Sequence, residues 1–173
     1  MRQVKLYIAC SIDGKIAGID GNVDWLPHPP EGEDYGYYSF YDSIDELVMG
    51  YKTYEICISL GDWPYKGKPT HVFTRDSSKS VVEDASLVTS DIVQFTKELK
   101  AKEGGDIWLV GGGNIIQQLH DADLIDEYII SYVPVILGAG IELFPNLKKM
   151  EKLQLIHHKV YADGLSLMHY KKG

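Results

Sequence analysis

Cysteine is scarce in this sequence. The chain of 173 residues contains two cysteines, Cys10 and Cys57, and neither belongs to a C-x-x-C pair or lies near a histidine cluster at metal-ligand spacing. The one histidine pair, His157-His158, would point to opposite faces of an extended strand. We therefore expect two buried thiols and no metal site. The zinc-deaminase pattern, H-x-E followed by P-C-x-x-C, is also absent.

Basic residues are also few, and no long apolar run is present. The chain has 17 Lys and Arg against 25 Asp and Glu, a net charge of −8, which argues against a nucleic-acid partner because such binding normally requires a basic surface. No stretch approaches the ~20 apolar residues of a membrane span. The first residues lead directly into an apolar strand without the cleavage site of a signal peptide. We expect a cytoplasmic protein without a membrane partner.

The pattern of elements predicts one α/β domain over residues 1–173. Length and composition suit a single core. Helices are expected at 37–43, after Lys52, at 92–102 with Ser90-Asp91 as its cap, and after the glycines near 112. Strands are expected at 3–10, 46–49, 70–74, 87–89, 106–110 and, as a long apolar run bent at Pro134, 125–137. This alternation indicates a mostly parallel sheet with helices on both faces.

The C-terminal segment adds antiparallel strands. Residues 153–160 and 165–170 read as strands separated by Asp163-Gly164, a pair that favours a hairpin. Together with the apolar run 125–137, this hairpin offers an edge or a face to a two-fold partner, which would form a homodimer.

The segment 13–33 is unusually long for a loop in a compact domain and is rich in Gly, Asp and Pro. Such a length is typical of functional loops, and Gly14, Gly18 and Gly21 would serve as hinges for closure over a site. Disorder is the alternative reading.

The segment 106–119, DIWLVGGGNIIQQL, is the most informative in the chain. An apolar strand runs into three glycines and then into an amphipathic helix, whose free N–H groups and dipole favour an anion such as a phosphate. A tight strand-to-helix turn packed against a neighbour is the alternative. The Rossmann pattern G-x-G-x-x-G is excluded because its third position is Ile116.

Two further strand ends carry cations. Lys52 follows Gly50 at a helix start, and Arg75 follows Thr74 at the end of a strand. Because ligands of parallel sheets bind beyond the carboxyl ends of the strands, these residues and the glycine triplet should share a cleft. Taken singly, each cation could be a solvated surface charge and each threonine a helix cap.

In five of its segments the chain resembles the dihydrofolate reductase superfamily, and especially stand-alone proteins similar to the reductase domain of bifunctional riboflavin-biosynthesis enzymes. These segments are Ala9-Cys10-Ser11-Ile12-Asp13-Gly14-Lys15-Ile16-Ala17, Met49-Gly50 with Thr53-Tyr54, Phe73-Thr74-Arg75, Val110-Gly111-Gly112-Gly113-Asn114, and Asp126-Glu127 with Pro134-Val135-Ile136-Leu137-Gly138. The resemblance implies a dihydrofolate-reductase-like fold that binds NADPH.

It also implies where the cofactor lies. The pyrophosphate would contact Gly111, Gly112, Gly113, Asn114 and Ile115 on one side and Gly50, Tyr51, Lys52 and Thr53 on the other, the adenosine 2′-phosphate would contact Thr74 and Arg75, and Ala9, Ile16 and Ala17 would flank the nicotinamide. Position 51 is Tyr where the family motif usually has Arg, so a preference for NADPH would depend on Arg75 and Lys52.

The resemblance places two catalytic candidates on the long loop. Lys15 would bind a phosphate or carbonyl of the substrate, with a mobile surface lysine as the alternative. Asp24 precedes Trp25-Leu26-Pro27, which is similar to the W-x-L-P-x-D/E segment of dihydrofolate reductases. Other carboxylates that could take this role, or simply be solvated, are Glu31, Glu33 and Asp34.

The substrate would be a small, flat heterocycle. Residues expected to contact it are Asp13, Trp25, Tyr38 and Tyr54. The alternative is that Asp13 serves just to shape a turn and that the aromatic side chains belong to the core.

Three functions remain in view. The first is an NADPH-dependent reductase of a flat nitrogen heterocycle, most like 5-amino-6-(5-phosphoribosylamino)uracil reductase of riboflavin biosynthesis, with a dihydrofolate or pterin reductase as the alternative. The second is a non-catalytic NADPH-binding sensor or partner module. The third is a structural homo-oligomer in which the glycines only aid packing.

Overall fold

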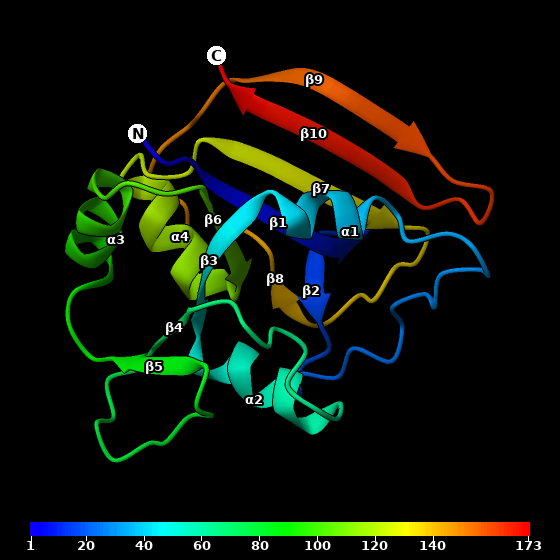
Figure 1. The fold of residues 1–173 in the computed structure, drawn as a ribbon. Helices are drawn as coiled ribbons and strands as arrows, with labels where there is room; N and C mark the ends of the chain where they lie inside the picture. The colour runs from blue at the N-terminus through cyan, green and yellow to red at the C-terminus, as the bar shows by residue number, and fades with distance from the viewer.

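The computed structural model describes all residues, 1–173, and its centre is an eight-stranded sheet (Figure 1). The strand order is β5-β4-β3-β6-β1-β7-β10-β9. The strands are β1 (Val4–Ser11), β2 (Lys15–Ala17), β3 (Ile44–Gly50), β4 (Thr70–Phe73), β5 (Ala85–Val88), β6 (Asp106–Gly111), β7 (Glu127–Val133), β8 (Ile141–Glu142), β9 (Leu153–Val160) and β10 (Ser166–Lys172). The helices are α1 (Tyr37–Asp42), α2 (Tyr51–Ser59), α3 (Ile92–Ala101) and α4 (Gly113–Asp121).

Six neighbouring strands, β5 to β7 in the sheet order, run parallel, and β10 and β9 follow antiparallel. The predicted fold class, a mostly parallel sheet with antiparallel C-terminal strands, is therefore confirmed. Because all six parallel strands point the same way, their carboxyl ends meet at one edge of the sheet.

Helices cover both faces of the sheet. On one face, α3 and α4 bury Leu99 and Leu119 against strand residues such as Leu6 and Leu109. On the other face, the partly buried aromatic residues of α1 and the buried Tyr54 of α2 pack around Leu47 and Trp108. The two layers leave no residue of β1 or β6 fully exposed, which explains the near-continuous apolar sequences of these central strands.

Most boundaries agree with the sequence pattern, and two differences have clear causes. β7 ends at Val133, so the apolar run 125–137 is not one long strand; Pro134 has no N–H group with which to continue the ladder. β5 begins at Ala85, earlier than expected, because it pairs in register with β4 from Thr70 onward. The predicted cap of α3 is confirmed: the Asp91 carboxylate accepts a hydrogen bond from the Gln94 N–H.

Two short strands were not predicted. β2 and β8 pair antiparallel and form a separate two-stranded sheet beside the carboxyl end of β1 (Figure 1). The Lys15 ammonium lies 3.0 Å from Glu142 across this pair. The Asp13 carboxylate accepts hydrogen bonds from the N–H groups of Leu137 and Gly138. The first part of the long loop is thus attached to residues 137–142.

The Asp126-Glu127 pair connects β7 to its neighbours. Asp126 accepts a hydrogen bond from the Val4 N–H at 2.7 Å and pairs with the buried Lys100 of α3. Glu127 lies 2.8 Å from His169 on β10. Both carboxylates therefore have structural contacts at the end of the sheet opposite the glycine turn.

The hairpin of β9 and β10 extends beyond the helical layers (Figure 1). β9 is the outermost strand, and all eight of its residues are exposed. The homodimer expected from this region stays a prediction. No helix in the structure has both the length and the apolarity needed to cross a membrane.

Candidate functional site

The largest cavity of the protein lies at the carboxyl ends of the parallel strands. It has a volume of about 590 Å³ and is mainly apolar. Its wall combines the carboxyl ends of β1, β3, β4 and β6, which the sequence placed together, with residues from β2, β8, α2 and α4. Of the predicted cofactor residues, it is lined by Ala9, Ile16, Ala17, Gly50, Tyr51, Lys52, Thr53, Gly111, Gly112, Gly113, Asn114 and Ile115.

The glycine triplet forms the sharp turn between β6 and α4. Gly111 has φ +147°, a conformation that disfavours a side chain. A Cβ atom on Gly112 would lie 3.3 Å from Thr53 Oγ1, and one on Gly50 would lie 3.2 Å from Ile115. These positions have little room for a side chain, and all three glycines of the triplet line the cavity with their backbone. The first N–H groups of α4 lack partners within the helix.

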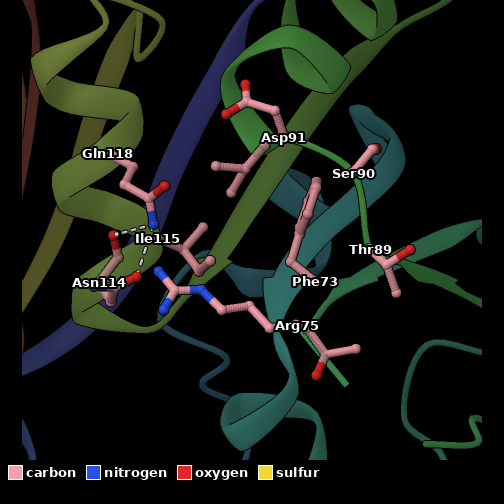
Figure 2. A pocket seen from close by; sticks show the side chains of 10 residues that line it. Phe73, Arg75, Thr89, Ser90, Asp91, Asn114, Ile115 and Gln118 are labelled. Atoms are coloured by element: carbon pink, nitrogen blue, oxygen red, sulfur yellow. Dashed lines mark hydrogen bonds between the residues drawn. The ribbon is translucent and has the colours of Figure 1, made fainter. Parts of the chain in front are cut away.

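A second cavity, of about 340 Å³, contains the remaining predicted cofactor residues, Thr74 and Arg75. The exposed Arg75 side chain extends from the end of β4 toward Asn114 on α4 (Figure 2). Ser90 and Gln118 also line this cavity, and the Gln118 amide donates a hydrogen bond to Asn114 Oδ1 at 2.7 Å. The wall thus offers a guanidinium and several neutral polar groups to an anion. The one carboxylate in the lining, that of Asp91, caps α3 by accepting a hydrogen bond from the Gln94 N–H.

The two cavities are neighbours, because Phe73, Asn114 and Ile115 line both. The combined cleft has an apolar end at Ala9, the glycine turn in the middle and Arg75 at the other end. This order of chemistry fits a dinucleotide that carries an additional phosphate: a flat ring in the apolar end, a pyrophosphate at a helix N-terminus and a phosphate at the guanidinium. The residues present therefore fit NADPH.

A third cavity, of about 310 Å³, adjoins the apolar end of the cleft, and Ala9 and Leu26 line both. Its wall contains several tyrosines and the carboxylates of Glu33 and Asp34, two of the acids considered from the sequence. It also contains Tyr7 and Ser131, which the sequence analysis missed. They alternate with core residues on buried strands, so no local pattern distinguishes them from packing residues.

The two predicted catalytic residues lie outside these three linings. The Lys15 ammonium pairs with Glu142, as described above. Asp24 is exposed, and its carboxylate accepts a hydrogen bond from the Asn22 side chain at 2.8 Å. Neither residue is brought to the apolar end of the cleft, and their catalytic roles stay predictions.

The predicted substrate residues are dispersed. Tyr38 lines the third cavity. Trp25 packs against a buried cluster that includes Tyr161 and Leu165, and its indole N–H has no partner. Tyr54 is buried beside Trp63, and its hydroxyl accepts a hydrogen bond from the Val82 N–H. Asp13 orders a turn, where hydrogen bonds from the Ser11 hydroxyl and then the Leu137 N–H lower its pKa to about 2.

Both cysteines are unpaired, Cys10 buried and Cys57 partly buried at the cleft wall. Burial raises the pKa of Cys10 to about 11, with a further contribution from Asp13. No three His, Cys, Asp or Glu side chains come together in a way that could hold a metal ion.

Comparison with known protein families gives one match over almost the whole chain: the model of the RibD C-terminal domain covers residues 2–167. The uncharacterized protein YwjB of Bacillus subtilis is 37% identical over 173 residues, which is 99% of each chain. The riboflavin biosynthesis protein RibD of Haemophilus influenzae is 31% identical over 86 residues, 46% of this chain and 23% of that protein.

Solved structures show the same fold. A riboflavin biosynthesis protein from Shewanella sp. PV-4, described as putative, superposes with a TM-score of 0.86 at 33% identity over 99% of both chains. The deaminase/5-amino-6-(5-phosphoribosylamino)uracil reductase of Thermotoga maritima gives 0.74 at 16% identity over 99% of this chain and 57% of that chain. Dihydrofolate reductase of Enterococcus faecalis, complexed with NADP(H), gives 0.73 at 18% identity over 99% of this chain and 96% of that chain.

Proposed function

The chain belongs to the RibD C-terminal domain family, and on this premise we propose that it is an NADPH-dependent reductase of a flat nitrogen heterocycle. The observation that carries the proposal is the pair of joined cavities between Ala9 and Arg75, which has the order of chemistry that NADPH requires. The Enterococcus reductase of the same fold was solved with NADP(H). When bound, NADPH supplies a hydride from its nicotinamide ring.

The chain's own residues would then perform three tasks. The glycine turn and Arg75 hold the phosphate groups, and Tyr51, Lys52 and Thr53 form the opposite wall. Ile16 and Ala17 cover the apolar end and exclude water from it. Ala9 has a small side chain between the cleft and the third cavity, so a heterocycle in that cavity can approach the nicotinamide closely.

A direct test is to titrate the purified protein with NADPH and NADH, following the emission of the reduced nicotinamide, and then to measure NADPH consumption with pyrimidines and dihydropterins. Tighter binding of NADPH than of NADH, followed by consumption that depends on protein and heterocycle, is the expected result. Failure of both nucleotides to bind would reject the proposal.

A second candidate is a module that binds NADPH without catalysis. The observation favouring it is the placement of Lys15 and Asp24 away from the cavity linings. Nucleotide binding without consumption of NADPH in the presence of any heterocycle that binds would support this module and reject the reductase.

A further inference from the structure

The third cavity lies beside the apolar end of the cofactor cleft and has a distinct polar character. It is bounded below by β1 and β7, through Tyr7, Ala9 and Ser131, and above by the loop from Leu26 to Asp34 and the start of α1. The rings of Tyr37 and Tyr38 form one wall, and the Tyr7 ring stacks on Phe40 at a centroid distance of 4.3 Å. The volume of about 310 Å³ and these flat walls suit a small planar ligand.

Two hydroxyl groups of the floor have no partner within the protein. Ser131 is only 6% exposed, and no hydrogen bond inside the chain uses its hydroxyl. The Tyr7 hydroxyl is likewise unused. Burial, and then the proximity of Tyr161 and Asp34, raises the pKa of Tyr7, so its phenol remains protonated. Neither hydroxyl is enclosed by protein, since both residues line the cavity, so a ligand bound there can form hydrogen bonds with both of them.

The charged groups of the lining have one sign. Glu33 and Asp34 are the only ionisable acids or bases in it apart from tyrosines, and no Lys, Arg or His lines the cavity. Hydrogen bonds from the N–H groups of Tyr38 and Gly36 lower the pKa of Asp34, which keeps it ionised at neutral pH. Lys159 approaches Glu33 to 3.7 Å from the hairpin, but it is half exposed and stacks on the Tyr161 ring.

We propose that this cavity binds a flat heterocycle that is rich in N–H donors and carries no phosphate, an inference about substrate class that rests on the proposed function. Ionised carboxylates accept hydrogen bonds from amino and ring N–H groups, whereas a phosphate beside them would be repelled and would find no cation in the lining itself. The substrate therefore differs from the phosphoribosylaminouracil in the name of the Thermotoga protein.

The test compares ligands that differ only in a phosphate. Binding is measured by calorimetry with protein saturated with NADP⁺, using 5-amino-6-(5-phosphoribosylamino)uracil and its phosphatase product, and dihydroneopterin with and without a phosphate ester. We expect the phosphate-free member of at least one pair to bind about ten-fold or more tightly than its partner. Tighter binding of the phosphorylated members, or no binding of any member, overturns the proposal.

Variants assign the selectivity to the cavity. Glu33→Gln keeps the oxygen that accepts the N–H groups of Asp34 and Tyr35, so the loop should be retained while the preference for the phosphate-free ligand falls about three-fold or more. Glu31→Gln changes the net charge equally at an exposed position of the same loop outside the lining, and it should leave the preference unchanged. Equal effects of both variants would overturn the assignment.

Ser131→Ala removes only the unused hydroxyl and should weaken the phosphate-free ligand about five-fold. An unchanged affinity in a folded variant would contradict a ligand on this floor. Two further titrations distinguish failure of the proposed function from failure of the cavity proposal. If NADPH does not bind in the absence of heterocycle, the proposed function is rejected. The ligand pairs, measured without nucleotide, would still decide whether the third cavity prefers the phosphate-free member.

Discussion

The Arg2 guanidinium lies 2.6 Å from the Glu46 carboxylate on β3, and Arg2 is only 4% exposed. The other oxygen of Glu46 lies 2.7 Å from His71 Nε2 on β4, and His71 Nδ1 lies 3.0 Å from the Ser86 hydroxyl on β5. A single carboxylate thus connects the start of the chain to one edge of the parallel sheet. Because a buried cation is costly without its partner, this contact should be important for stability.

We expect Glu46→Gln to lower the free energy of unfolding by about 3 kcal/mol, since the buried Arg2 would lose its counter-charge. Urea unfolding followed by tryptophan emission measures this change. Glu103→Gln, at an exposed position, is the control and should stay within about 0.5 kcal/mol of the original protein. A loss below about 1 kcal/mol for Glu46→Gln would show that the pair contributes little.

Low pH should lower the folding stability of the protein, in part through protonation of Glu46. Burial opposes ionisation of Glu46, but hydrogen bonds from His71 and Arg2 outweigh it and hold its pKa below the ordinary value. Because the pKa of Glu46 is lower in the folded state than in the unfolded state, ionised Glu46 stabilises the fold at pH values above the unfolded-state pKa of about 4.3. This stabilisation is lost as the pH falls through the folded-state pKa. Melting temperatures measured between about pH 6 and pH 3 should therefore fall less steeply for Glu46→Gln than for the original chain.

Arg75→Ala should separate the two nicotinamide nucleotides. We expect NADPH binding to weaken by about 1–3 kcal/mol because a charge-assisted phosphate contact is lost, with little change for NADH. Titration of both nucleotides measures the difference. Lys97→Ala removes an exposed cation from α3, away from the cavities, and controls for net charge. Equal losses for both nucleotides would refute the assignment of Arg75 to the 2′-phosphate.

Two glycine variants should act differently although the glycines are adjacent. A side chain at Gly112 faces the cleft beside Thr53, so Gly112→Val should weaken NADPH and NADH about ten-fold while the protein stays folded. A Cβ on Gly113 would lie 2.5 Å from the Glu142 carbonyl oxygen and 3.2 Å from Pro145. Gly113→Ala should therefore lower the free energy of unfolding by about 1–3 kcal/mol. Identical behaviour of the two variants would contradict this division.

Much of the fold was predictable because most helices and strands are long enough to show their burial as a pattern of apolar residues in the sequence. β1 and β6 are apolar runs, α3 shows helical spacing with a capping aspartate, and the hairpin of β9 and β10 has a turn pair at its tip. β2 and β8 are three and two residues long, too short to show any periodicity. Their pairing depends on contacts between residues far apart in the chain.

The site divides in the same way. The proposed cofactor side could be predicted from strand ends and glycines, both of which carry local signals, and the structure brings the residues expected there to two joined cavities. The proposed substrate side depends on which side chains of the long loop line the third cavity. Glu33 and Asp34 line the third cavity, whereas Asp24 bonds to its own loop. Sequence spacing does not encode that choice.

The β2–β8 pair has a final consequence, for the entropy of ligand binding. Ile16 and Ala17 lie on β2 and Ile141 lies on β8, and all three line the largest cavity. Contacts from Gly14 to Leu143 and from Ile12 to Val135 fix this wall from both sides. The wall is therefore ordered before any nucleotide arrives, so the conformational entropy of residues 12–17 is lost during folding and not during binding. A closing motion of the long loop would therefore involve residues 18–33, which follow β2 and include residues that line the third cavity.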